Sequence, residues 1–279
     1  MSALTPFWLC ARQEMVLSTR SRWTQTFAVV FAVLALAVAS SGYVLSGGSG
    51  LQDFSRTSAS LVQLVLLLVP LTSLVFGVVA LTPDAGSAEI LFSQPVARRA
   101  ILAGKLLGLC LALVGSQAIG FGIAGAALLL RTGSEGAGGF LSVAAGSAAL
   151  TAVFLALSAA VTGGDTSARR AHHLGVALVV WFVTVVLFDI GALGLASLLP
   201  SGPASRLLMV AAIVNPVDAV RTGTLMAVEG TTAFGSASLA FLRFTGGAAG
   251  AAAWLTLSTL FWILVPTWAG AARLRKADL

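Results

Sequence analysis

Long apolar stretches recur along this chain, and each could cross a lipid bilayer as a single helix. A hydrocarbon core about 30 Å thick needs roughly 20 predominantly apolar helical residues. Stretches of this kind lie near residues 24–45, 61–82, 100–130, 139–162, 174–199 and 247–270. The pattern predicts an all-α polytopic membrane protein with six transmembrane helices.

Composition supports this interpretation. Hydrophobic residues make up 58% of the chain, charged residues only 9%, and the mean hydropathy is +0.98. Soluble domains carry about 25% charged residues. We therefore expect one transmembrane domain over residues 1–279 and no large soluble domain. The net charge of +6 does not indicate nucleic acid, because the basic residues form short clusters between apolar stretches and no continuous face.

The basic clusters occupy every second connection between the apolar stretches. Eleven of the 16 basic residues lie in four clusters, namely Arg12, Arg20 and Arg22; Arg98, Arg99 and Lys105; Arg169 and Arg170; and Arg273, Arg275 and Lys276. The remaining connections, which would lie on the opposite side of the membrane, carry only Arg56, Arg131 and, in one long segment, Arg206, Arg221 and Arg243. Cytoplasmic loops of membrane proteins are enriched in Lys and Arg. The distribution predicts a multi-pass protein of the cytoplasmic (inner) membrane with both termini cytoplasmic.

The first 22 residues mix apolar and basic side chains. Over residues 5–22 the pattern is compatible with a helix lying along the inner interface, and a merely basic flank is an equal alternative. A cleaved secretory signal would need a cleavage site such as Ala37-Val38-Ala39. The long apolar run, followed by five more, favours a retained first span instead.

No set of carboxylates, histidines or serines converges at spacings that indicate an enzyme. The dipeptide Gly104-Lys105 resembles the end of a phosphate-binding loop, but Arg99 and Leu106 occupy the positions that need Gly and Ser or Thr. We therefore expect a non-catalytic membrane subunit that binds no metal or cofactor directly. Any ATP hydrolysis must come from a partner chain.

A few polar residues inside or beside the spans need an explanation. Asp189 is the one acidic residue well inside a span, and a carboxylate there is a functional candidate because burying its charge is costly. Counting about 1.5 Å per residue from Leu174 places it roughly 22 Å along the helix, where pairing near the outer interface and a transport role both remain open. His172 and His173 are expected to form a loop-facing polar pair. Cys10 and Cys110 form no paired motif.

Small residues at helical spacing permit close contacts between helices. Gly104 with Gly108 and Gly246 with Gly250 are such pairs. Ordinary packing within the chain explains them, and the second pair could equally be a hinge before the last span.

The connection between the second and third spans carries the most distinctive motifs. It has Pro83 and Pro95 near its ends, with room for a short amphipathic helix between them, and continues into Gly104-Lys105. This segment resembles the region between spans two and three of ABC-2 type transporter permeases, where a Gly-Thr-x-Glu step precedes a Pro-Val-x-Arg turn and a Gly-Lys. Relatives commonly carry a charged run where this chain has Pro83-Asp84-Ala85.

Three further stretches are most similar to permease subunits of nitrous oxide reductase maturation transporters. They are Ala11-Arg12-Gln13-Glu14 with Arg20-Ser21-Arg22-Trp23; Asp165 to Ala171 with Trp181-Phe182 and Phe188-Asp189-Ile190; and Asn215-Pro216-Val217-Asp218-Ala219-Val220-Arg221. With the first segment, they extend the resemblance over nearly the whole chain.

The resemblance implies a homodimer of six-span subunits, each resting on an ABC ATPase that binds ATP and Mg. It implies cytoplasmic coupling segments at 83–99 and 163–173, with short coupling helices. The coupling candidates are Asp84, Glu89, Arg98, Arg99, Arg169 and Arg170. It also implies an extracytoplasmic maturation protein and a role in assembling the copper–sulfur centre of the reductase, through export of a sulfur species or through transmembrane signalling.

The segment at 201–245 is too long for a turn, and we expect it to be an extracytoplasmic and partly helical segment. Asn215 can cap a helix whose first residue is Pro216, which places Asp218 and Arg221 on one face. These four residues are candidates for docking an outside partner. The alternative is a loop that simply covers the bundle.

Other function classes fit the hydropathy. An ABC-2 exporter permease for a drug, a lipid or another substrate is the nearest alternative. A secondary transporter would need ionisable groups near the membrane midplane, and Asp189 is the only candidate. A structural membrane subunit with no transport of its own is a further alternative.

Overall fold

The computed structural model describes residues 4–45, 50–82, 97–132, 137–163, 170–230 and 235–276. Within these ranges all regular secondary structure is helical. Six helical segments are long and apolar enough to cross a membrane, as predicted. They are α2 (Arg22–Leu45), α3 (Gly50–Leu81), α5 (Arg98–Thr132), α6 (Ala137–Thr162), the continuous run of α7 (Arg170–Phe182), π-helix η1 (Val183–Leu187) and α8 (Phe188–Ser197), and α12 (Ala248–Lys276).

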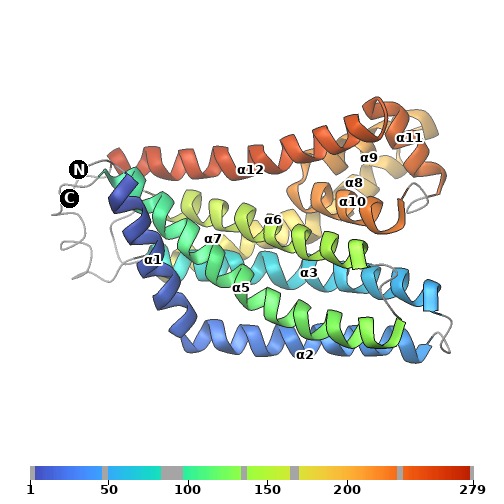
Figure 1. The fold of residues 1–279 in the computed structure, drawn as a ribbon. Helices are drawn as coiled ribbons and strands as arrows, with labels where there is room; N and C mark the ends of the chain where they lie inside the picture. The colour runs from blue at the N-terminus through green and yellow to red at the C-terminus, as the bar shows by residue number, and fades with distance from the viewer. Residues whose placement is uncertain are drawn as a thin grey trace.

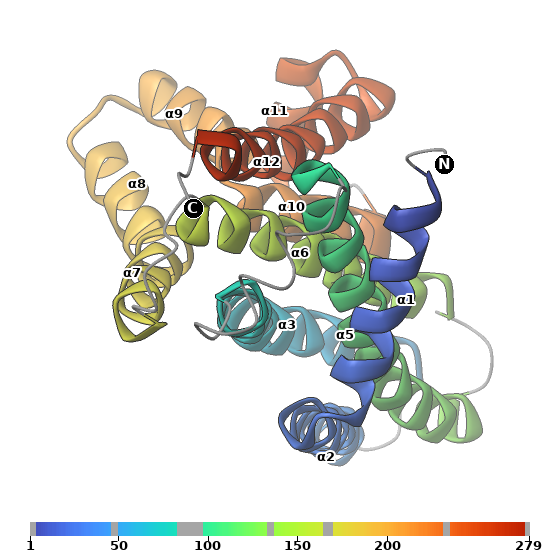
Figure 2. The same cartoon turned by 90° about the vertical axis from the view of Figure 1, so that its left-hand side faces the viewer.

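The six spans run side by side and alternate in direction (Figure 1). Helix α1 (Leu4–Arg20) crosses one end of the bundle (Figure 2). We call this end, which also holds the start of α2 and the last turns of α3, α6 and α12, the basic end. The opposite end, here called the distal end, carries α9 (Ser201–Val214), α10 (Pro216–Glu229) and α11 (Ser236–Thr245).

Helix α6 is the centre of the bundle. It packs against α3, α5, α10 and α12, and 50% of its span is buried, against 6% for the span of α7 and α8. Its small residues allow this closeness: a Cβ on Gly146 would lie 3.2 Å from Val220 of α10. Gln117 of α5 donates to Thr151 Oγ1 (2.9 Å) and accepts from Ser147 Oγ (2.7 Å), so a satisfied polar contact ties α5 to α6 inside the apolar core.

The predicted N-terminal helix is present, and two glycines of α5 hold it. A Cβ on Gly104 would lie 2.7 Å from the Phe7 carbonyl oxygen, and one on Gly108 would lie 2.8 Å from Glu14 Cβ. Only a residue without a side chain lets the backbones approach this closely. The Gly104 and Gly108 pair therefore fixes α1 across the basic end.

Part of the segment expected to be extracytoplasmic packs into the helix bundle instead of only covering it. Helices α9 and α10 meet at a bend of 99° at Asn215, and we call the two together the hairpin. A bent pair of this length and apolarity is typical of a broken span or a re-entrant loop. Helix α10 buries Val217, Ala219 and Val220 and packs against α6, α12 and α3. Its contact Gly146 lies eight residues from the distal start of the α6 span at Gly138, or about 12 Å at 1.5 Å per residue.

The turn between α11 and α12 resolves the role of the second glycine pair. Gly246 ends α11 in the left-handed conformation with φ 84°, and the Gly247 amide donates to the Leu242 carbonyl at 2.7 Å. This is the hydrogen bond of a glycine helix cap. The positive φ of Gly246 and Gly247 thus forms the turn that ends α11, and the missing side chain of Gly250 lets α12 start close to the Thr245 carbonyl.

Candidate functional site

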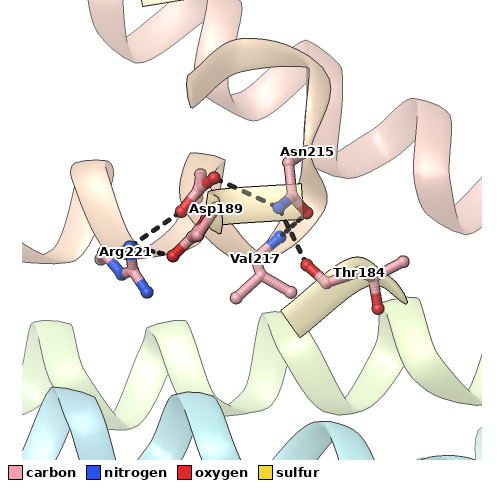
Figure 3. A network of polar contacts seen from close by, with 6 residues as sticks. Thr184, Asp189, Asn215, Val217 and Arg221 are labelled. Atoms are coloured by element: carbon pink, nitrogen blue, oxygen red, sulfur yellow. Dashed lines mark hydrogen bonds and ion pairs between the residues drawn. The ribbon is translucent and has the colours of Figure 1, made fainter. Parts of the chain in front are cut away.

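A network of polar residues joins the bent hairpin to α8 inside the distal end (Figure 3). Arg221 Nη1 lies 2.9 Å from Asp189 Oδ2 and 3.0 Å from Asp218 Oδ1. Asn215 Nδ2 donates to the second Asp218 oxygen at 3.2 Å. The side chains of Asp189, Asp218 and Arg221 are 28%, 13% and 26% exposed, so the two carboxylates share one guanidinium in a largely enclosed setting.

Asn215 is the corner of the hairpin, and it bonds in two directions. Its Oδ1 accepts from the Val217 amide at 3.1 Å, and Pro216 is the first residue of α10, so the predicted helix start and cap are confirmed. Its Nδ2 also donates to the Thr184 carbonyl at 2.9 Å. Thr184 lies in the π-helix, whose wider turn changes which carbonyls find partners inside the helix. One side chain therefore fastens the hairpin to the middle of the α7–α8 span.

The last carbonyls of α9 are satisfied from α12. Trp262 Nε1 donates to the Val214 carbonyl at 2.8 Å, and the Ser258 hydroxyl donates to the Ile213 carbonyl. A helix leaves its final carbonyls without partners of its own, and leaving them bare in an apolar environment is costly. These bonds explain how the chain can bend by 99° inside an apolar bundle.

A cavity of about 630 Å³ opens beside the network. Asp189, Asp218 and Arg221 lie on its wall, and the rest of the lining comes mostly from small and apolar residues of α8, α9 and α11. It combines a charged patch with apolar walls, which is typical of a binding site.

The two roles of Asn215 can be separated by substitution. Asn215→Ser keeps a capping oxygen and loses the Nδ2 bonds to Thr184 and Asp218, whereas Asn215→Ala loses the cap as well. We expect Ser to cost about 2 kcal/mol of stability and Ala about 3, since a helix cap and a net hydrogen bond each contribute about 1 kcal/mol. Thermal unfolding of the purified protein measures both. Equal losses for the two variants would show that the cap contributes nothing.

At the basic end, three arginines bond to the C-terminal ends of neighbouring helices. Arg98 Nη1 donates to the Leu274 carbonyl of α12 at 3.0 Å, and Arg273 Nη1 donates to the Ala160 carbonyl of α6 at 2.9 Å. Arg170 Nη2 donates to the Thr82 carbonyl, directly after α3, at 3.3 Å. Helix C-termini carry unpaired carbonyls and partial negative charge, which cations stabilise. All three spans that end at the basic end have such a partner.

Lys105 links α1 to the end of α3. Its ammonium lies 3.7 Å from Glu14 Oε2 and 3.4 Å from the Ala80 carbonyl oxygen. Burial raises the pKa of the Glu14 carboxyl, and the charge of Lys105 partly offsets this. Gly104-Lys105 thus serves helix packing and pairing.

The structure separates the predicted coupling residues. Arg98 and Arg170 bond to helix ends within the chain, while Arg99 is exposed. Asp84, Glu89 and Arg169, with most of segment 83–99 and part of 163–173, lie outside the described residues. Their contact with a partner stays a prediction.

One expectation about the histidines was wrong. Only His172 is exposed; His173 is 3% exposed, and its Nδ1 lies 3.4 Å from Thr82 Oγ1. The helical phase of α7 turns His173 towards α3, which the adjacency of the two residues in sequence did not reveal.

At the distal end, the sequence singled out Asp189 and the group Asn215, Pro216, Asp218 and Arg221, but not their association. Four of these side chains form the network, with the Thr184 carbonyl as a partner that sequence reasoning missed. An acidic residue inside one span and an arginine in the next apolar segment are the feature that could have suggested the pair. Docking of an outside protein on these residues stays a prediction.

Residues 8–279 match the family described as "ABC-2 family transporter protein". The chain belongs to the ABC-2 transporter family. It is 31% identical over 272 residues to the "Probable ABC transporter permease protein NosY" of Pseudomonas aeruginosa, covering 95% of this chain and 94% of that protein. It is 35% identical over 241 residues to the protein of the same name in Stutzerimonas stutzeri, covering 83% and 86%.

This ABC-2 chain is therefore an ABC transporter permease subunit, a multi-pass membrane protein of the NosY type. A permease of this kind works with an ATPase partner. It has two candidate sites. One, at the basic end, is formed by the helix C-termini that accept hydrogen bonds from Arg98, Arg170 and Arg273, and the other, at the distal end, is the polar network of the hairpin.

Proposed function

We propose that this protein is the permease subunit of a transporter that serves maturation of nitrous oxide reductase. The observation that carries the proposal is its similarity to two proteins named NosY along nearly the full length of both chains. The permease passes ATP-driven movement of a separate ATPase across the membrane, for export of a sulfur species or for signalling during assembly of the copper–sulfur centre. ATP and Mg bind to the ATPase, and the permease itself is not catalytic.

The basic end is the cytoplasmic end in this proposal, and the ATPase binds there. The enrichment of Lys and Arg supports this orientation. Movement of segment 83–97 would reach α12 through Arg98, and movement of the end of α3 would reach α7 through Arg170. The helix-end contacts thus connect both predicted coupling segments to the spans.

The subunit acts as a homodimer in this proposal. The α7–α8 span and α12 are the least covered spans, with 6% and 11% buried. Contact with lipid alone would also explain exposed apolar helices, so the dimer needs a direct test. The test introduces Leu187→Cys, at an exposed residue of η1, into a Cys10→Ser, Cys110→Ser background and measures disulfide formation between two copies. A disulfide between two copies in native membranes supports contact along this span.

A protein outside the membrane binds at the distal end, near the hairpin network. The cavity beside Asp189, Asp218 and Arg221 supports this part, because it is a hollow with charged and apolar walls on that side. Asn215 and Pro216 shape the hairpin that borders it.

Two experiments test the proposal. Purification from native membranes in mild detergent, followed by mass spectrometry, should recover an ABC ATPase and an extracytoplasmic maturation protein. Deletion of the gene should leave nitrous oxide reductase without the absorption of its copper–sulfur centre. An ATPase without the outside protein, together with an intact reductase, would indicate an exporter of another substrate, and no ATPase in several detergents would contradict the coupling role.

The exposure of Arg99 gives a matched pair of variants. We expect Arg99→Glu to lower the ATPase recovered with the permease at least about fivefold, since reversing a charge at a contact costs 1 kcal/mol or more, with no change in thermal stability. Arg98→Gln should instead lower stability by about 1 kcal/mol through loss of its bond to Leu274. Unchanged ATPase recovery with Arg99→Glu would remove this residue from the contact.

A further inference from the structure

The cavity at the distal end lies between two pairs of helices. Helices α8 and α9 form the wall on one side, and α10 and α11 form the wall on the other. Helix α10 is held in the bundle, since it packs on α3, α6 and α12, and α11 packs on α12. Helices α8 and α9 are joined by the three residues 198–200 and pack on each other, and we call these two helices the flap. The cavity therefore widens if the flap moves away from α10 and α11.

Few apolar contacts hold the flap in place. Ala196 is the one buried residue of α8, and α9 has none. Ile190 and Leu193 of α8 are 62% and 61% exposed, and Leu198 at the tip of the flap is 82% exposed. Among the described helices outside its own span, α8 packs closely only on α9, and it lies at the edge of the bundle (Figure 2). Segments with so few buried contacts have low local stability.

Both ends of the flap are breaks in regular α-helix. At the start, η1 packs on α3 and α10, and the packing against the bundle ceases where α8 begins. Single π-helical turns are frequent at functional sites. At the other end, Asn215 leaves the helical conformation with φ −80° and ψ 124°. Hinges in proteins are a few residues of this kind, at the ends of helices.

Hydrogen bonds fix the base of the flap and leave its tip free. Asn215 Nδ2 donates to the Thr184 carbonyl at 2.9 Å, so one bond joins the two breaks. Trp262 Nε1 donates to the Val214 carbonyl at 2.8 Å and holds the last turn of α9 to α12. These bonds place a common axis at the base, about which α8 and the first turns of α9 can turn together.

One ion pair joins the flap to α10 among the described residues. Asp189 is on α8, and its Oδ2 lies 2.9 Å from Arg221 Nη1. Arg221 has a second partner on its own helix, because Nη1 also lies 3.0 Å from Asp218 Oδ1. Movement of the flap therefore breaks one ion pair and leaves the guanidinium paired. Asp189 is already 28% exposed, and water reaches it in the opened cavity, so the cost of breaking the pair is moderate.

We propose that the flap is a gate of the distal cavity. It turns about η1 and Asn215, and the pair of Asp189 with Arg221 is the latch that holds it closed. When the latch opens, the cavity is joined to the surroundings of α8, and Arg221 stays with Asp218. The gate does not depend on the proposed role in reductase maturation, because a permease for another substrate could use it in the same way.

The test measures movement of the flap tip in the transporter, purified with the subunits it keeps and placed in lipid nanodiscs. Spin labels at Leu198→Cys and at Leu141→Cys, an exposed residue near the distal start of α6, are introduced into a Cys10→Ser, Cys110→Ser background. Labelled subunits are diluted with unlabelled ones, so that double electron–electron resonance reports distances within one chain. We expect a main distance and a second, longer one.

The matched control moves the first label to Leu178→Cys, an exposed residue of α7 before the hinge. Its distance to the label at Leu141→Cys should be single, because α7 packs on α3 and α6. Equal spread for the two label pairs would show that the whole span moves, without a hinge at η1. A tip distance that stays single in the protein and in the two variants that follow would overturn the gate.

Two variants separate the latch from a general loosening of the network. Asp189→Asn should raise the share of the longer tip distance about fivefold, the upper range for an ion pair that keeps some exposure. Asp218→Asn removes the other carboxylate from the same guanidinium and leaves Asp189 as its one partner, so it should not raise that share. An equal increase in both variants would contradict the latch.

Opening of the cavity itself is measured by cysteine labelling in the same background. Thr222 is 9% exposed and lines the cavity on the α10 side, opposite the flap. Asp189→Asn should raise the rate at which N-ethylmaleimide labels Thr222→Cys about fivefold, in step with the open share. Thr224→Cys is the control, because Thr224 is 7% exposed on the same helix and does not line this cavity. No increase at Thr222→Cys, or the same increase at both positions, would contradict a gate on this cavity.

Discussion

Replacing Arg221 by Gln should destabilise the protein more than replacing either of its carboxylate partners. Among the described residues, Arg221 is the one cation in contact with both Asp189 and Asp218. Its removal leaves two neighbouring carboxyl groups with no counter-ion, which must either repel each other or take up a proton. Breaking a buried ion pair by removing one partner costs about 3–5 kcal/mol. Because these side chains are 13–28% exposed, we expect about 2–4 kcal/mol, measured by thermal or denaturant unfolding in detergent.

The single carboxylate variants are the controls. In Asp189→Asn, Arg221 keeps Asp218, and in Asp218→Asn it keeps Asp189, so each should cost about 1 kcal/mol, the net value of one hydrogen bond. The triple variant with Asn at both acidic positions and Gln at 221 carries no charge, and it should recover at least half of the loss. If Arg221→Gln costs no more than Asp189→Asn, the shared counter-ion is not the reason these residues lie together.

This network also shows the limit of sequence reasoning. Asp189 and Arg221 could each be singled out, because charges are rare in apolar segments. Their pairing depends on the 99° bend between α9 and α10, which returns the chain to α8. The bend in turn depends on bonds from Ser258 and Trp262, more than forty residues further on. No local pattern contains that information.

The spans themselves were predictable because one physical requirement sets them. The length of the apolar stretches, with Lys and Arg at alternate ends, predicted the six long apolar helices that the structure contains. The same arginines illustrate what was missed. Counting charges gave Arg98 and Arg170 a topological role, whereas the structure shows them bonded to the last carbonyls of α12 and to Thr82, after α3. Which helix end each arginine reaches depends on how neighbouring spans are staggered.

The π-helix has a local feature that could have raised attention. Val183, Thr184, Val185 and Val186 form a run of β-branched residues, which fit an α-helix less well than unbranched residues do. The run does not specify a π turn, since tertiary bonds decide between helix types. Here the bond from Asn215 to the Thr184 carbonyl is such a contact.

Substituting Gly108 by Ala should detach α1 from α5. The added Cβ would lie 2.8 Å from Glu14 Cβ and 2.9 Å from the Met15 amide, and it would overlap the Ala11 carbonyl. Backbone atoms cannot move aside as a flexible side chain can, so α1 as a whole must shift. We expect a loss of about 1–3 kcal/mol, the usual cost of overpacking, and a larger loss for Gly108→Leu.

Gly115 provides a control on the same helix. A Cβ there meets nothing within 4 Å, so Gly115→Ala should be neutral or should stabilise α5 by up to about 1 kcal/mol, because Ala is the better helix former. If Gly108→Ala lowers the free energy of unfolding and Gly115→Ala raises it, the loss at Gly108 comes from the contact with α1 and not from helix propensity.

The displacement of α1 can be followed directly with Cys10. Its Cβ would lie 2.9 Å from a Cβ on Gly104, so the thiol lies at the α1–α5 contact. In a Cys110→Ser background, Gly108→Leu should raise the rate at which a maleimide labels Cys10, and Gly115→Ala should leave that rate unchanged. Equal rates in the two variants would mean that α1 stays in place by contacts other than these glycines. The pair of Lys105 with Glu14 would then be the contact to test next, because it is the one ion pair that joins α1 to α5 among the described residues.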